Sequence, residues 1–148
     1  PTPTYTLPPW IPPTRTPTPG GPLTPTPTPP LDRPSITIYT NASLYHSKDS
    51  FRLAVTIVNP IQSMFVMEYI ILDYQYHYWF WPDWTETING KFLILPGQTR
   101  ISDETILEFE WPDIQTALYD VTFWAALTEP NGYNVVGDFG MCMFDFEP

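Results

Sequence analysis

The sequence predicts an all-β fold: an immunoglobulin-like antiparallel β-sandwich of about seven to nine strands, preceded by an extended polyproline II arm. Three observations support this prediction. Short runs of β-branched and aromatic residues recur between residues 35 and 148, turn-forming residues separate them, and no run has the period of an amphipathic helix. Residues 1–34, in contrast, contain 14 Pro and 9 Thr. The chain therefore divides into an arm, residues 1–34, and one domain, residues 35–148.

Eight runs in the domain have the composition of β-strands. They cover residues 35–40, 51–58, 64–72, 76–81, 92–95, 105–111, 119–128 and 135–146. Apolar and polar residues alternate most clearly at residues 51–58, which indicates a half-buried strand. Residues 64–72 are apolar on both faces, which predicts a central strand whose outer side is covered. Tyr119, near the start of the penultimate run, fits the tyrosine corner of immunoglobulin-like domains.

The arm is expected to be extended because each Pro fixes φ and also restricts the residue before it, which excludes helix and central strand. At about 3.1 Å per residue it reaches on the order of 100 Å if straight. A domain of this size has a radius of roughly 13 Å. Large apolar residues that a solvated linker does not need interrupt the Thr-Pro run, and we predict that they anchor the arm on neighbouring subunits. These anchors are Tyr5, Leu7, Trp10, Ile11, Leu23 and Leu31.

Composition excludes several classes of partner. The net charge is −10, and the arm carries two Arg against one Asp, so the domain alone carries −11. Such a domain repels nucleic-acid phosphates and anionic membranes, and no apolar run approaches the roughly 20 residues of a membrane helix. Cys142 is the only cysteine, so the chain has no disulfide framework and no cysteine-based zinc site.

The Thr/Pro composition predicts covalent glycans and an extracellular or cell-surface location, because such stretches are typical of O-glycosylated stalks. The candidate O-glycosylation sites are Thr2, Thr16, Thr18, Thr24, Thr26 and Thr28. Asn41-Ala42-Ser43 matches the N-glycosylation pattern. A chance match in a loop explains this short pattern equally well. A chain that begins Pro-Thr-Pro-Thr without Met is expected to be processed or incomplete.

We expect neither an enzyme nor a cofactor. His46 and His77 are the only histidines and lie far apart in the sequence, with no metal-ligand spacing around them. No Gly-x-Ser-x-Gly elbow is present. Glu108 and Glu110 share a strand face and could imitate a glycosidase pair, but like charges on an exposed strand are common. A calcium ion held by acidic loop residues stays open, although no Asp-x-Asp-x-Asp-Gly spacing is present.

An aromatic block at residues 74–84 predicts a contact surface. If Tyr78 and its alternate neighbours face inward, one strand directs a stripe of apolar rings outward, and this stripe consists of His77, Trp79 and Trp81. Such a stripe can stack on sugar rings or receive a proline-rich segment. The alternative is that Trp81 and Trp84 only cap one end of the sandwich. We favour capping for Trp84 and contact for Trp79 and Trp81.

Five short motifs in the domain resemble those of a known group of proteins. They are SITIYTN (35–41), KDSFRLAV (48–55), WFWPDWT (79–85), ILEFEWP (106–112) and FWAALTEPNGYNVVGDFG (123–140). With them the domain resembles one that recurs at the C-termini of uncharacterised exported bacterial proteins, usually after a Thr/Pro-rich linker. The resemblance implies an immunoglobulin-like sandwich on a secreted or cell-surface protein. It supplies no catalytic residue, and the arm lies outside it.

These observations predict a structural subunit of an extracellular helical filament, in which the arm, O-glycosylated on its threonines, packs on neighbouring copies. An arm passed head-to-tail makes a heterologous contact, which propagates instead of closing. The predicted partners are copies of the same chain and covalent glycans, without nucleic acid or membrane insertion. The alternative function is a carbohydrate-binding or adhesion module of a secreted or cell-surface protein, with Trp79 and Trp81 stacking on glycan.

Overall fold

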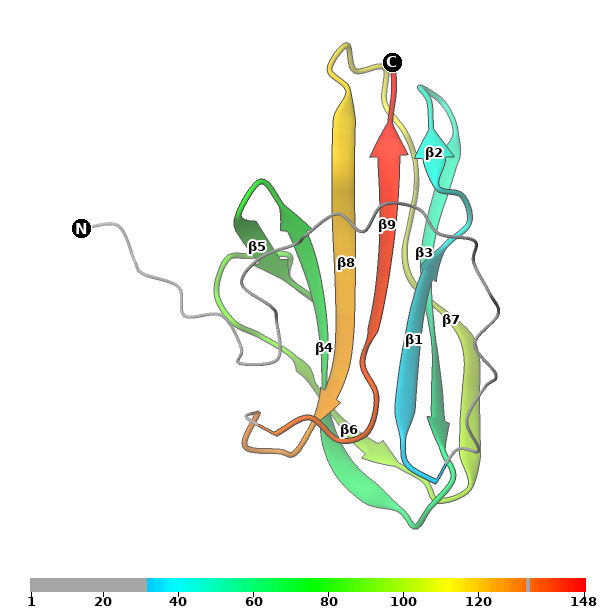
Figure 1. Ribbon diagram of the computed structural model, residues 1–148, viewed down its shortest axis with the longest axis vertical. Helices are drawn as coiled ribbons and strands as arrows, with labels where there is room; N and C mark the ends of the chain where they lie inside the picture. Colours follow the sequence, from blue (N-terminus) through cyan, green and yellow to red (C-terminus); the bar gives the residue numbers. More distant parts are fainter. Residues whose placement is uncertain (1–31, 133) are drawn as a thin grey trace, which may run out of the picture.

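The computed structural model describes residues 32–132 and 134–148, and the regular structure within them is entirely β-strand (Figure 1). This confirms the all-β prediction. The predicted arm anchors and the candidate O-glycosylation threonines lie outside the described residues. Within the described ranges, no helix is long and apolar enough to cross a membrane.

The strands form two sheets that face each other across one core. The smaller sheet has the order β1-β3-β7, with β1 at Ser35–Thr40, β3 at Ser50–Asn59 and β7 at Thr99–Glu110. The larger sheet has the order β2-β9-β8-β4-β5, with β2 at Leu44–Tyr45, β9 at Gly140–Phe146, β8 at Leu118–Thr128, β4 at Met64–Tyr74 and β5 at His77–Phe80. The sixth strand, β6 at Lys91–Leu95, pairs with the first half of β4. All pairings are antiparallel except β2 with β9.

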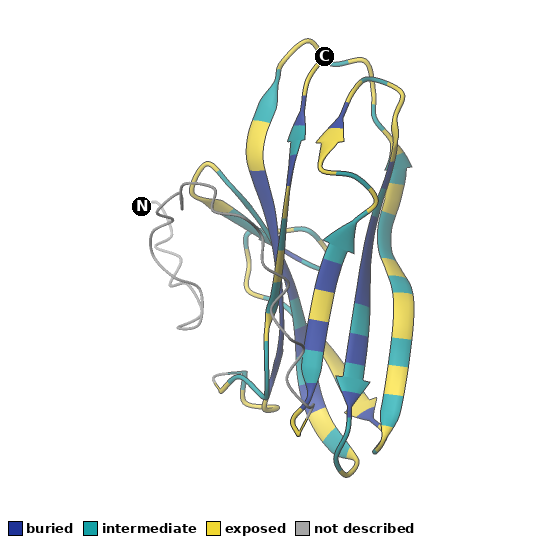
Figure 2. Ribbon diagram, turned by 45° about the vertical axis from the view of Figure 1, so that its right-hand side comes forward, coloured by how far each residue is buried: buried dark blue, intermediate teal, exposed yellow. Residues whose placement is uncertain are grey.

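The alternation at residues 51–58 produces the centre of the smaller sheet. Phe51, Leu53, Val55 and Ile57 on β3 are each at most 1% exposed, while β1 and β7 pair on either side. The alternation is visible as bands of buried and exposed residues along the strands (Figure 2). Each inward side chain removes apolar surface from water, worth roughly 1.5–3 kcal/mol per residue of this size.

The strand β4 is central and apolar on both faces, as its sequence predicts. Val66 and Ile70 point into the core between the sheets. On the opposite face, Ile71 packs with Phe80 of β5 and Trp124 of β8 in a separate buried cluster. The outer side of the larger sheet is therefore partly covered by its own aromatic residues.

Three local predictions differ from the structure because backbone irregularities interrupt the alternation. The strand β7 begins at Thr99, well before the predicted residue 105, since register shifts and a positive φ of 57° at Asp103 mask its first half. The strand β9 begins at Gly140, later than predicted, after Gly137 at φ 76°. Tyr119 is 56% exposed, because a register shift with Asp120 at φ 57° turns it outward, so it does not form a buried tyrosine corner.

The base of the arm is fixed against the approach to β9. The Asp138 backbone N–H donates to the Pro34 carbonyl (3.1 Å), and Arg33 pairs with the Asp138 carboxylate (2.9 Å). Gly137 lies so close that a Cβ there would meet the Pro34 oxygen at 1.8 Å. The arm therefore leaves the domain at a defined point, beside β1 and the start of β9 (Figure 1).

Candidate functional site

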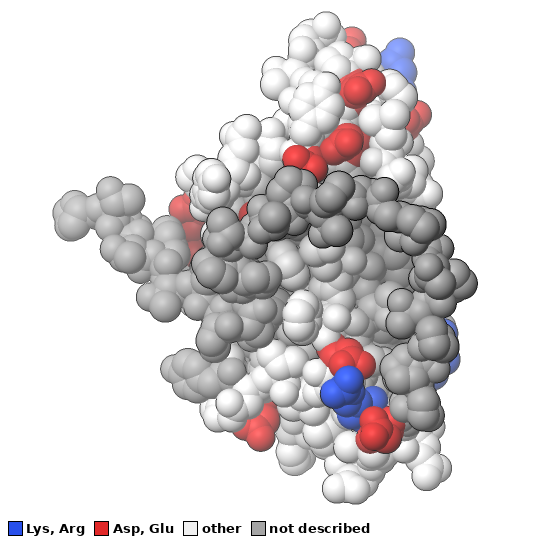
Figure 3. Space-filling model, viewed as in Figure 1, with Lys and Arg blue, Asp and Glu red and all other residues white. Residues whose placement is uncertain are grey.

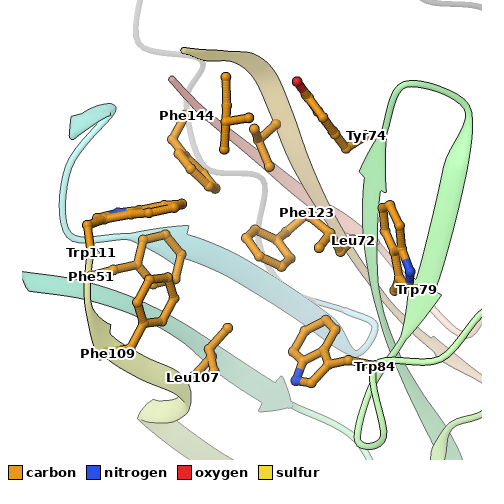
Figure 4. A pocket seen from close by; sticks show the side chains of 12 residues that line it. Phe51, Leu72, Tyr74, Trp79, Trp84, Leu107, Phe109, Trp111, Phe123 and Phe144 are labelled. Carbon is orange, nitrogen blue, oxygen red and sulfur yellow. The ribbon is translucent and has the colours of Figure 1, made fainter. Parts of the chain in front are cut away.

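An apolar cleft of about 360 Å³ lies between the two sheets (Figure 4). Its lining includes Trp79 from the edge strand β5 and Leu107 and Phe109 from the edge strand β7. Other lining residues come from β3, β4, β8 and β9, and Trp84 and Trp111 lie in the connections between strands. On the opposite side β1 approaches β9 so closely that a Cβ at Gly140 would meet the Ile36 oxygen at 2.8 Å. The two sheets therefore meet closely along β1 and β9 and leave space between them at the β5 and β7 edges.

Aromatic rings of the core form one side of the cleft. Phe51 stacks on Phe109 with centroids 4.8 Å apart, and Trp111 meets Phe109 edge-on at 5.0 Å. Trp84 meets Phe123 edge-on at 5.9 Å. Because these rings also pack against one another in the core, their positions are set by the fold and do not depend on an occupant.

The predicted contact surface is only partly assembled. His77 and Trp79 stack with centroids 5.7 Å apart, and the His77 Nδ1 lies 3.2 Å from Glu86 Oε1. Trp79 lines the cleft, whereas Trp81 is half-buried against the core, with the Lys91 Nζ 5.5 Å from its ring centroid. The stripe therefore contributes one wall of the cleft through Trp79 and does not form a flat surface of three rings.

The two faces of β5 point in directions opposite to those expected from the sequence. Phe80, expected toward the core, packs with Ile71 and Trp124 on the outer side of the larger sheet, and Tyr78 lies against the same cluster. Trp79 is directed toward the other sheet instead. Alternation along a strand sets which residues share a face, but the pairing register decides which face meets the core. The turn at Gln75 and Tyr76 places Trp79 opposite Leu72, which also lines the cleft.

The chemistry of the cleft favours an apolar occupant. Nearly all of the lining atoms are apolar, and none of the lining residues is an acid, a base or a nucleophile. The Tyr74 hydroxyl already accepts a hydrogen bond from the Gln75 amide at 3.2 Å. Trp111 Nε1 is buried without a partner in the described part of the chain. A sugar, which needs several hydrogen-bonding partners beside a stacking ring, would find few here.

Two buried titratable groups lie elsewhere in the domain. Glu68 on β4 is 1% exposed, and burial, helped by Glu104, raises its pKa to about 7 against the opposing effect of Lys91. Its Oε1 has no hydrogen-bond partner among the described residues. Burial also raises the pKa of the Cys142 thiol to about 12, which keeps the thiol protonated and unreactive at neutral pH.

The acidic residues of the described ranges do not form a metal centre: no three His, Cys, Asp or Glu side chains there lie close enough to hold an ion. Asp103 accepts a hydrogen bond from the Arg52 guanidinium at 2.8 Å, and a second from Tyr39. These hydrogen bonds, chiefly that of Arg52, lower the pKa of the Asp103 carboxyl.

Asn41, the candidate N-glycosylation residue, is exposed in the connection between β1 and β2. Its Oδ1 accepts from the Tyr45 hydroxyl at 2.7 Å and from the Arg52 N–H at 2.8 Å, and its Nδ2 donates to the Ser50 carbonyl at 2.9 Å. The side chain therefore also organises this connection. Its glycosylation stays a prediction.

Comparison of the chain with protein-family models and with curated proteins found no match. The resemblance to exported bacterial proteins stays a prediction.

Proposed function

We propose that the protein is a structural subunit of an extracellular filament, in which the Pro/Thr arm of one copy docks in the aromatic cleft of the next. The observation that carries the proposal is the cleft itself: an opening of about 360 Å³, walled by aromatic rings and almost free of polar atoms. Proline-rich segments bind such grooves because they are already extended and lose little conformational entropy on docking.

We also infer that the domain is immunoglobulin-like. The strand order supports this: β1, β3 and β7 stand in one sheet and β9, β8 and β4 in the other. These positions correspond to strands A, B and E and to strands G, F and C of that fold. In the proposed filament, folded domains follow one another and each arm connects one domain to the next.

The arm has a segment suited to the cleft. Trp10 and Ile11 stand between two Pro pairs, in the order Pro-Pro-Trp-Ile-Pro-Pro. Flanking Pro residues favour an extended, stiff backbone, so we expect this segment to present both side chains to a partner. A large ring and a branched aliphatic group match an apolar cleft whose walls are Trp and Phe rings.

The reach of the arm favours a neighbouring copy. The longest strand, β7, has 12 residues and spans about 40 Å. The arm, at about 3.1 Å per residue, reaches well beyond that length if straight. It also carries a small positive charge, whereas the domain carries −11. Domains therefore repel one another at a distance, and an arm joins them without bringing two acidic surfaces together.

The proposal is tested in the full chain with Trp10→Ser/Ile11→Ser, which removes the anchor, and Trp79→Ala, which removes a wall of the cleft. We expect wild-type chains to form filaments in negative stain and each variant to be monomeric by size exclusion at about 1 μM, well below the concentrations at which weak contacts between copies are populated. A mixture of the two should form one-to-one heterodimers and stop there, because one partner has only a cleft and the other only an arm.

The control is Tyr119→Ala, which removes an exposed aromatic ring outside the cleft and should leave assembly unchanged. Thermal denaturation of each variant checks that the domain is still folded. Filaments that persist in both the arm and the cleft variants, or wild-type chains that stay monomeric, would contradict the proposal. Saccharide binding lost on Trp79→Ala would favour the carbohydrate-binding alternative instead.

A further inference from the structure

We propose that the chain has a second interface, independent of the arm and the cleft, in which β6 pairs edge-to-edge with β6 of a second copy. The proposal goes beyond filament formation through the arm, because it predicts that two copies associate even when the arm cannot dock.

The strand β6 has one partner within the described part of the chain. Its residues pair with the first half of β4, Phe92 opposite Met67 and Ile94 opposite Phe65, and no described strand lies along its other edge. An edge of this kind presents backbone N–H and C=O groups that can continue the sheet. Natural edges are usually protected by charges, Pro or bulges, and residues 91–95 contain only one charge, Lys91, and no Pro.

Apolar side chains accompany this edge on the outer side of the larger sheet. Phe65, Phe92 and Ile94 are 57%, 54% and 65% exposed. The two Phe rings stack with centroids 5.7 Å apart, so they form one continuous patch. We call these three residues the β6 patch. A patch that lies directly beside an open edge would be buried further when a second strand is added there.

The charge distribution favours a second copy at this position. Residues 58–67 and 88–102, which contain β6 and the connections at that end, include no Asp or Glu, although the domain as a whole carries −11. In Figure 3 the extreme lower tip shows only uncharged side chains on the face in view, and the acidic side chains of that face lie above it. Two copies can therefore approach through this end without the repulsion that acts elsewhere on the surface.

The edge is also self-complementary. If two β6 strands pair antiparallel about a two-fold axis at Leu93, Phe92 of each copy faces Ile94 of the other, which joins the two β6 patches. Aromatic and β-branched residues are favourable cross-strand pairs. The arm is less suited to this position, because its many Pro residues have no N–H to donate to the ladder. A second copy of β6 is therefore the occupant to which the structure points.

The interface is small, so we expect a weak dimer when it acts alone. Five paired residues and three exposed side chains per copy bury less area than stable interfaces of about 1,200 Å² or more. When the arm also connects the copies, the effective concentration rises to about the millimolar range, and the same contact becomes populated. Filaments joined by the arm would then associate laterally in pairs.

The test uses the full chain carrying Trp10→Ser/Ile11→Ser, so that arm docking cannot produce association. Sedimentation velocity from about 10 μM to about 1 mM should show a monomer–dimer equilibrium. Adding Ile94→Lys should weaken it at least about tenfold, because the new charge lies on the pairing edge. Tyr119→Lys, which places the same charge on another exposed apolar position, should leave it unchanged.

Hydrogen exchange of the same protein separates strand pairing from contact through side chains only. Amides of residues 91–95 should exchange more slowly at high than at low protein concentration. The absence of a dimer, a dimer unaffected by Ile94→Lys, or a dimer without slower exchange in this segment would each overturn the proposal. Because arm docking is disabled throughout, these outcomes do not depend on whether the wild-type chain forms filaments.

Discussion

Replacing Glu68 with Gln should stabilise the domain at about pH 8 and remove most of the stability loss between about pH 5 and about pH 8. Glu68 is buried on β4, and burial raises its pKa from an ordinary value of 4.5 to about 7. In the window between these values the folded state binds more protons than the unfolded state, so the free energy of unfolding falls as the pH rises.

The stabilisation is complete below the ordinary pKa and is lost as the pH rises through the folded-state pKa. One pKa unit corresponds to about 1.4 kcal/mol, so the loss across the window is roughly 3 kcal/mol as an upper bound. Gln resembles the protonated carboxyl in shape and has no charge to desolvate. The variant should therefore keep at high pH the stability that the wild type has only at low pH.

Urea denaturation of both proteins at several pH values measures the effect directly. Glu108→Gln is the matched control, since Glu108 is an exposed carboxylate on β7 and its replacement should leave the pH dependence as in the wild type. Equal wild-type stability at both ends of the range would show that the buried carboxylate does not titrate as argued.

Replacing Gly137 with Ala should loosen the base of the arm and destabilise the domain by more than about 2 kcal/mol. Gly137 has φ +76°, a left-handed conformation that alone costs about 1–2 kcal/mol for a residue with a Cβ. In addition, the new Cβ would lie 1.8 Å from the Pro34 carbonyl oxygen. Since that contact is with backbone, the chain must shift, and the Asp138 to Pro34 hydrogen bond is lost.

Gly132→Ala is a close control, because Gly132 has the same φ of +76°. There the new Cβ would meet the Tyr69 hydroxyl at 2.7 Å, a side-chain end that can move. At an equal φ, the difference between the two variants in urea denaturation compares a clash with backbone to a clash with a side chain. Faster hydrogen exchange at Ile36, whose N–H donates to Asp138, should appear only in Gly137→Ala. Equal destabilisation by both variants would contradict the argument.

The sequence predicted the long strands of the core because their side chains alternate without interruption. In β3, and in β8 from Val121 onward, the inward residues are apolar at every second position, so burial decides both the strand and its inward face. The strand β2 was missed because two residues carry no period. It forms because Tyr45 is buried, with its hydroxyl bonded to Asn41 and to the Ala42 N–H.

The cleft could be predicted only in part. Alternation placed Phe109 and Trp111 on one face of their strand, and the aromatic block singled out Trp79. Nothing local in the sequence shows that these rings would line one opening, because the lining comes from distant segments in two different sheets. Glu68, in contrast, had a visible signal: it is the one charged residue within the apolar run 64–72.

The fixed base of the arm also determines how the domain would respond to force. The arm continues directly into β1, which pairs with β3 from Ser35 opposite Val58 to Thr40 opposite Leu53. Tension that pulls along the axis of β1 would shear this whole ladder at once and would not open it one bond at a time. A filament joined in this way would resist stretching at each domain through the hydrogen bonds between β1 and β3 acting together.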